Sequence, residues 1–285
     1  YWDNVGVQYG LRAVANGDIT PEEFLKLNGS VGGWKNEPDM VQETRPFLPV
    51  GAFDPWSAKN QVFSTDPLNN PAPRVQGDVL AMNAVYEAGL VFRGDIDIPI
   101  LDIRPYRERI LDMHNSHQSF ASRQRMLNAD GDASNQAIWF IDEPATVDIT
   151  PVALDVIDEW MANIAADPKA GVVANKPADA VDRCFETNGT QIAAGPDVWD
   201  GILDDDAAGA CTSRFKVFAT TRQVAGGPIE QSYFKCALVP VSDAISRGLY
   251  GQWTPTAAQQ ATLERIFPTG VCDYTQPDQG LPPGW

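Results

Sequence analysis

A strand, a helix, a second strand and a second helix follow one another in the middle of the chain. The apolar runs at 98–103 and 137–141 each have the length of a buried strand. Helical patterns follow them at 116–128 and from Thr150 onward. Strands that are apolar throughout, rather than alternating, are typical of a parallel sheet covered on both faces. The sequence therefore predicts an α/β fold containing part of a doubly wound sheet.

Shorter patterns predict further helices on either side of this core. Thr20 followed by Pro21 and Glu23 is typical of a helix start, because Thr caps the first turn and Pro fits the first helical position. Apolar spacing predicts other helices at 6–16, 74–89 and 256–266.

Two strands are too few for a complete sheet of this type, so we expect the rest of the sheet elsewhere. The stretch 31–73 is rich in Pro, Gly and Asn, which favours an irregular, lid-like segment. Beyond residue 167 the chain becomes rich in Pro and Gly. We therefore predict two parts, a core at 1–167 that includes the lid-like segment and an irregular extension at 168–285 that packs on it.

The formal net charge is −17, which argues against a nucleic-acid partner, since binding to phosphate backbones needs clustered Lys and Arg. No apolar run approaches the roughly 18–20 residues of a membrane span. The sequence begins at Tyr1 without an initiator Met, so we expect a proteolytically processed product or a fragment.

Four cysteines lie in the C-terminal part, at Cys184, Cys211, Cys236 and Cys272. None forms a CxxC pair and the only two histidines are distant in sequence, so we expect no metal and no cofactor. Two disulfides in a secreted or periplasmic protein are the better interpretation. Three pairings are possible, and sequence order favours Cys184–Cys211 with Cys236–Cys272.

The two histidines, His114 and His117, follow the first predicted strand. Histidine is the usual general base near neutral pH. A histidine with a carboxylate beside it would supply two of the three members of a serine-hydrolase triad. Asp112 is a near neighbour of His114, whereas Asp102 lies at the expected end of the strand, where sites gather in doubly wound sheets. A hydrogen-bonded structural role is the alternative for each histidine. No convincing nucleophile motif occurs, since Ser30 lacks the first glycine of Gly-x-Ser-x-Gly.

Other side chains are candidates for contact with a substrate. Arg104, Arg107 and Arg109 are candidates to bind a substrate carboxylate, although pairing with Asp and Glu is the commoner role in an acidic protein. Trp34 and Trp56 are candidates to line an apolar or aromatic ester pocket, although aromatic packing is again commoner.

Several stretches together resemble the C-terminal part of an exported α/β-hydrolase-like family associated with tannase-like esterases and hydroxybutyrate-oligomer hydrolases. They are DNVGVQYGL at 3–11, ITPEEFLKLN at 19–28, IPILDIR at 98–104, DMH at 112–114 with SFASR at 119–123, VAGGPI at 224–229 and IFPTGVCDY at 266–274. The resemblance runs nearly from end to end of the chain.

This resemblance implies that the nucleophilic Ser lies upstream, on a separate chain or segment, so that the working protein would be a heterodimer if the two parts are cleaved. It also implies that His114 is the base, because its Asp-x-His spacing matches the family. In the usual α/β-hydrolase order the His follows the last strand, here 138–141, and no His does so. Either the base has moved to the preceding loop or it comes from another chain.

The sequence thus predicts a serine-type ester hydrolase acting on a small or oligomeric ester through an acyl-enzyme. One alternative is a non-catalytic binding or structural subunit of an exported complex. The other is a metal-dependent hydrolase that uses Asp112 and His114.

Overall fold

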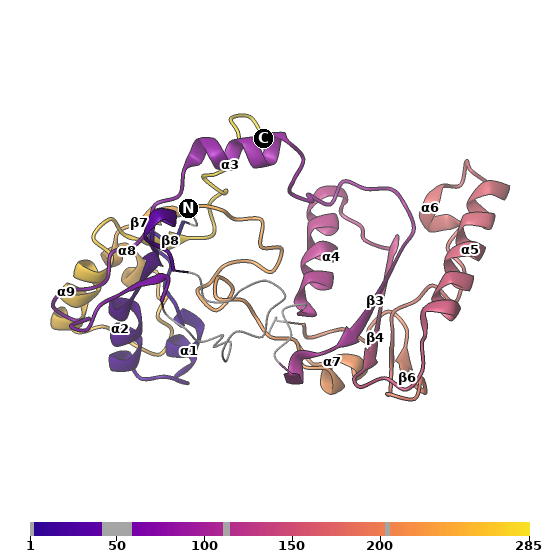
Figure 1. The fold of residues 1–285 in the computed structure, drawn as a ribbon, viewed down its shortest axis with the longest axis horizontal. Coiled ribbons are helices and arrows are strands. Elements are labelled where there is room, and N and C mark those ends of the chain that lie inside the picture. The colour runs from indigo at the N-terminus through magenta and orange to yellow at the C-terminus, as the bar shows by residue number, and fades with distance from the viewer. Residues whose placement is uncertain (1–2, 42–58, 111–114, 203–205) are drawn as a thin grey trace. The chain divides into compact units, whose positions relative to one another are not determined.

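The computed structural model describes residues 3–41, 59–110, 115–202 and 206–285, and they form two compact units (Figure 1). The first unit combines residues 1–91 with 220–285, and the second contains residues 92–219. The predicted boundary at residue 167 falls inside the second unit. Among the described residues, no helix has both the length and the apolar character needed to cross a lipid bilayer.

The first unit joins the beginning of the chain to its end. Its helices are α1 Leu11–Asn16, α2 Pro21–Ser30, the 3₁₀ helix η1 Glu37–Asp39, α3 Val79–Glu87, α8 Val241–Ser246 and α9 Ala257–Ile266. Its strands form two antiparallel pairs, β1 Val31–Trp34 with β2 Gln61–Phe63, and β7 Ala237–Val239 with β8 Val271–Asp273.

The second unit holds the larger sheet. Its strands are β3 Ile100–Tyr106, β4 Gln136–Asp142, β5 Arg183–Phe185 and β6 Gln191–Ala194. Its helices are the 3₁₀ helix η2 Glu108–Ile110, α4 His117–Asp130, α5 Thr150–Ala166, α6 Gly171–Ala174 and α7 Ala210–Arg214. The strands lie in the order β3-β4-β5-β6, with two parallel pairings followed by one antiparallel pairing. The fold is therefore mixed α/β with a central mixed sheet.

Strand β4 is buried over all seven of its residues. One face packs on α5, where Trp139 contacts a cluster that includes Val156 and Trp160. On the other face, Phe140 lies among the aromatic rings of Phe120 in α4, Trp199 and Phe215, with Trp199 4.5 Å away between ring centroids. The sheet is thus covered on both faces, as its uniformly apolar strands predict (Figure 1).

Several predicted elements are confirmed, because their local signals are strong. Thr20 and Glu23 form a reciprocal capping box at the start of α2, with Pro21 at the first helical position. The two predicted strands pair in parallel, with Asp102 opposite Ile138. These four strands do not establish the predicted doubly wound sheet of a hydrolase, which stays a prediction.

The two stretches predicted to be irregular contain short strands. The stretch 31–73 contains β1 and β2, and the stretch 168–285 contributes strands to both units. These strands have only three or four residues each, too short to show an alternating pattern. Residues 42–58, within the predicted lid-like segment, lie outside the described residues.

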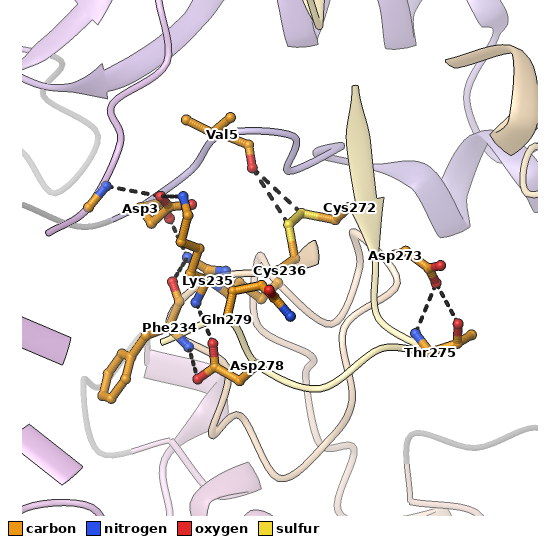
Figure 2. The surroundings of a disulfide bond; sticks show 12 residues. Asp3, Val5, Phe234, Lys235, Cys236, Cys272, Asp273, Thr275, Asp278 and Gln279 are labelled. Atoms are coloured by element: carbon orange, nitrogen blue, oxygen red, sulfur yellow. Dashed lines mark hydrogen bonds and ion pairs between the residues drawn. A yellow bond between two sulfur atoms is a disulfide. The ribbon is translucent and has the colours of Figure 1, made fainter. Parts of the chain in front are cut away.

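Both favoured disulfides are present. Cys184–Cys211 joins β5 to α7, and Cys236–Cys272 lies beside the pairing of β7 with β8. The carbonyl oxygen of Val5 faces both sulfur atoms of the second disulfide, at 3.6 and 3.7 Å (Figure 2). This disulfide therefore lies against the first described residues of the chain.

Phe140→Ala is expected to lower the free energy of unfolding of the second unit by about 3–5 kcal/mol, because the ring lies at the centre of an aromatic cluster and leaves a cavity when removed. Urea denaturation monitored by tryptophan fluorescence measures the loss. Phe218→Ala, at a half-exposed ring, is the matched control and should change stability by less than about 1 kcal/mol. Equal losses would contradict this account of the core.

Candidate active site

The residues predicted for catalysis centre on the segment that connects β3 to α4. Asp112 and His114 fall in 111–114, outside the described residues, as does Trp56. Asp102 and Arg104 lie on β3 in the second unit, whereas Trp34 ends β1 in the first unit. The roles predicted for these residues therefore stay predictions, and the described surroundings set limits on them.

Asp102 is the third residue of a seven-residue strand. The sequence placed the end of the strand near Ile103, but β3 continues to Tyr106, so Asp102 does not lie at the carboxyl end. One of its carboxylate oxygens is 3.5 Å from Nε of Arg104, which projects from the same face two residues later.

Arg104 ties β3 to the start of α4. Its Nε donates a hydrogen bond to Oγ of Ser119 at 2.7 Å, and its Nη1 donates to the carbonyl oxygen of Asn115 at 3.2 Å. The backbone N–H of Ser116 donates to Oε1 of Glu108, in η2, at 2.6 Å. The described residues on both sides of 111–114 are thus fixed by polar contacts within the second unit.

His117, the first residue of α4, is 1% exposed. Its burial places it in the interior of the second unit rather than on its surface, which fits the preference for His114 as the residue that meets a substrate.

A charge cluster lies at the carboxyl end of β4. Asp142, which is 3% exposed, accepts hydrogen bonds from Arg109, from Nη2 of Arg214 at 2.7 Å and from the backbone N–H of Glu143 at 2.9 Å. Arg214 also contacts Glu186 at 3.3 Å. The hydrogen bond to Asp142 raises the pKa of Arg109. We call Asp142, Arg109, Arg214 and Glu186 the carboxyl-end cluster.

One contact in the carboxyl-end cluster bears on the alternative roles that the sequence left open for Arg109. Arg109 pairs with Asp142, as expected of arginines in an acidic protein, and stacks over the Tyr106 ring at 5.0 Å. The sequence analysis missed Asp142, although its position directly after the apolar run 137–141 was a usable signal. Its partner Arg214 carried no such signal.

Trp34 lines a cavity of about 600 Å³ in the first unit. Its side chain is 43% exposed, and Tyr9, Leu27 and Arg222 share the lining. A cavity of this size with mostly apolar walls suits a small ligand. Contact of Trp34 with a substrate stays a prediction.

Within the described part of the chain, no group of three or more His, Cys, Asp or Glu side chains is arranged to hold a metal ion. The residues named for the metal-dependent alternative, Asp112 and His114, lie outside that part.

The described residues form a mixed α/β fold with two disulfides and a charge cluster at the end of a parallel strand. The chain belongs to the tannase-like family of unknown function DUF6351, whose family model matches residues 1–283. This confirms the resemblance drawn from the sequence motifs. Membership of this family suggests hydrolase or esterase activity and goes no further. No curated protein and no solved structure shows a significant match to the chain.

Asp142→Asn is expected to lower the free energy of unfolding by about 2 kcal/mol, because it keeps the shape of the side chain and removes the charge that faces two guanidinium groups. Denaturant unfolding measures the change. Asp179→Asn is the matched control, since Asp179 is 73% exposed and pairs with Arg183 on the surface. That change should cost less than about 0.5 kcal/mol, and an equal cost at both positions would contradict the structural role of the cluster.

Proposed function

We propose that the protein is a serine-type ester hydrolase that works through an acyl-enzyme, and that this chain supplies the general base and the carboxylate that orients it. The observation that carries the proposal is the fixing of Glu108, Asn115 and Ser116 around the segment that bears Asp112 and His114. This segment follows a parallel strand of a sheet covered on both faces, where catalytic groups commonly gather. The tannase-like family supports the same class of reaction.

In the proposed reaction, His114 removes the proton from the nucleophilic Ser hydroxyl as its oxygen attacks the ester carbonyl carbon. The protonated imidazole then gives that proton to the leaving alkoxide, and the alcohol departs. Water then attacks the acyl-enzyme with His114 again as the base, and the imidazolium returns the proton to the departing Ser oxygen as the carboxylic acid is released. The substrate would be a small or oligomeric carboxylic ester.

The nucleophile is proposed to come from an upstream N-terminal chain or segment, on a Gly-x-Ser-x-Gly turn, because no such motif occurs in this sequence. The two disulfides favour an oxidising compartment, so we propose a secreted or periplasmic protein. Proteolytic processing into a two-chain enzyme is part of the same proposal.

Between the two candidate carboxylates, the described contacts favour Asp112. Asp102 lies in the body of β3 and faces Arg104, whose other contacts fix the start of α4. We therefore assign Arg104 and Asp102 to positioning the connection between β3 and α4. Arg104 then acts through the segment it fixes and makes no contact with the substrate.

His114→Ala is expected to abolish covalent labelling by a fluorescent fluorophosphonate and to lower kcat/KM for p-nitrophenyl butyrate by about 10³-fold or more, because the Ser proton then has no acceptor. The preparation must contain the upstream segment together with this chain. His117→Gln is the comparison, and after a check of folding by circular dichroism it should keep the label. Label on this chain rather than on the upstream segment would overturn the location of the nucleophile. Absence of label from every polypeptide would overturn the serine mechanism.

Asp112→Asn is expected to lower kcat for the same ester by about 10³-fold with little change in KM, because the imidazole loses the group that orients it. Asp102→Asn should lower kcat by less than about tenfold, since its neighbour Arg104 keeps its contacts with Ser119 and Asn115. The reverse ranking of the two variants would assign the orienting role to Asp102.

A further inference from the structure

A second cavity of the first unit, of about 620 Å³, differs from the rest of the molecule in the charge of its lining. Its walls come from the segments 71–76 and 265–269, together with residues of the first described segment and of the stretch around β7. Three cationic side chains line it, Arg74, Lys235 and Arg265, and no Asp or Glu does. The chain as a whole has 38 acidic and 21 basic side chains, so a lining of this composition is unusual for this protein.

Lys235 already has a counter-ion. Its Nζ lies 2.7 Å from Oδ2 of Asp3, which is buried and also accepts a hydrogen bond from the backbone N–H of Gly77 (Figure 2). The backbone of the same lysine is fixed by Asp278, which accepts from its N–H at 2.8 Å. Lys235 is therefore a neutralised, rigid part of the wall.

Arg74 has no carboxylate counter-ion among the described residues. Its guanidinium lies over the rings of Tyr9 and Phe267, at 4.8 and 5.4 Å from the centroids, and its Nη2 donates to Asn28. Its Nε and Nη1 are buried and make no hydrogen bond within the described part of the chain. Burial lowers the pKa of Arg74, an effect that the nearby Tyr9 partly offsets. Burial of a charged guanidinium without a counter-ion is costly, and an anion bound beside it offsets part of that cost.

Arg265 lines the same cavity from α9 and is exposed. It donates a hydrogen bond to the carbonyl oxygen of Leu68, and no ion pair of Arg265 occurs among the described residues. One of its N–H groups is thus used, and the others can donate to a ligand, since a guanidinium has five.

The remaining walls are mainly apolar, and among them are Pro71, Leu238, Phe267 and Pro268. Apolar walls suit the body of an organic molecule, whereas the two arginines suit a planar anionic group that accepts two hydrogen bonds. We propose that this cavity binds a small organic carboxylate, with its anionic group at Arg74 and Arg265 and its apolar part against Pro71, Phe267 and Pro268. The proposal does not depend on the esterase function, because none of these residues belongs to the β3–α4 segment.

Isothermal titration of the whole protein with benzoate tests the proposal, with benzamide as the neutral molecule of the same shape. Benzoate is expected to bind with a Kd on the order of 1 mM, as befits a small ligand, and benzamide at least about tenfold more weakly. Equal binding of the two would overturn the role of charge. Inorganic phosphate is titrated in parallel, and tighter binding of phosphate than of benzoate would overturn the assignment to a carboxylate.

Variants locate the binding. Arg265→Glu should weaken benzoate binding by at least about tenfold, whereas Arg12→Glu makes the same charge change on the exposed face of α1, away from the cavity, and should leave it unchanged. Arg74→Met should abolish binding, and because Arg74 is packed between two rings its folding is checked by thermal unfolding. Unchanged binding in Arg265→Glu would overturn the site even if Arg74→Met fails to fold. His114→Ala should bind benzoate normally, which separates this proposal from the esterase proposal.

Discussion

The burial of β4 on both faces is the constraint on which the rest of the second unit depends. The apolar side chains of a strand with no exposed face need a packed layer on each side of the sheet. Its backbone N–H and C=O groups have no water to bind, so they need a paired strand on each edge. β3 and β5 supply the edges in parallel, α5 covers one face, and α4 with Trp199 and Phe215 covers the other. Along β4, polar side chains are therefore confined to the two ends of the strand, at Gln136 and Asp142.

The carboxyl-end cluster follows from this confinement. Asp142 ends the buried strand, so its charge would be costly without partners, and Arg109 and Arg214 approach it from two different elements. At the neighbouring strand, Arg104 performs a different task, because it joins β3 to the first turn of α4. The connection that bears Asp112 and His114 therefore begins and ends at residues that the sheet fixes in place, a condition that acid–base chemistry requires of its supporting structure.

Strong local signals made much of the second unit predictable. The runs 98–103 and 137–141 are long enough and apolar enough to specify buried strands. Thr150, Pro151 and a sustained apolar spacing predict α5. The short strands β1, β2 and β5–β8 were not predictable in this way, because three or four residues are too few to show a pattern. Most of them also pair with strands far away in the sequence, although β6 pairs with the nearby β5. Distance along the sequence also hid the partner of Asp142, since Arg214 lies 72 residues further along. For the site, the sequence named the strand and the connection after it, whereas the contacts of Arg104 depend on tertiary packing.

The discontinuous first unit has a consequence for synthesis. Residues 92–219 form a unit of their own, so every strand of the central sheet has left the ribosome before the last part of the first unit is made. Residues 3–41 and 59–91, by contrast, lack some of their partners until β8 emerges at 271–273, where the N–H of Cys272 donates to the carbonyl oxygen of Gly6. The apolar residues of α1 and α2 therefore stay without part of their core until α8, α9 and β8 have been made. During that interval these apolar residues are open to non-native contacts, so aggregation is a hazard of synthesis that a discontinuous unit carries and the continuous second unit does not.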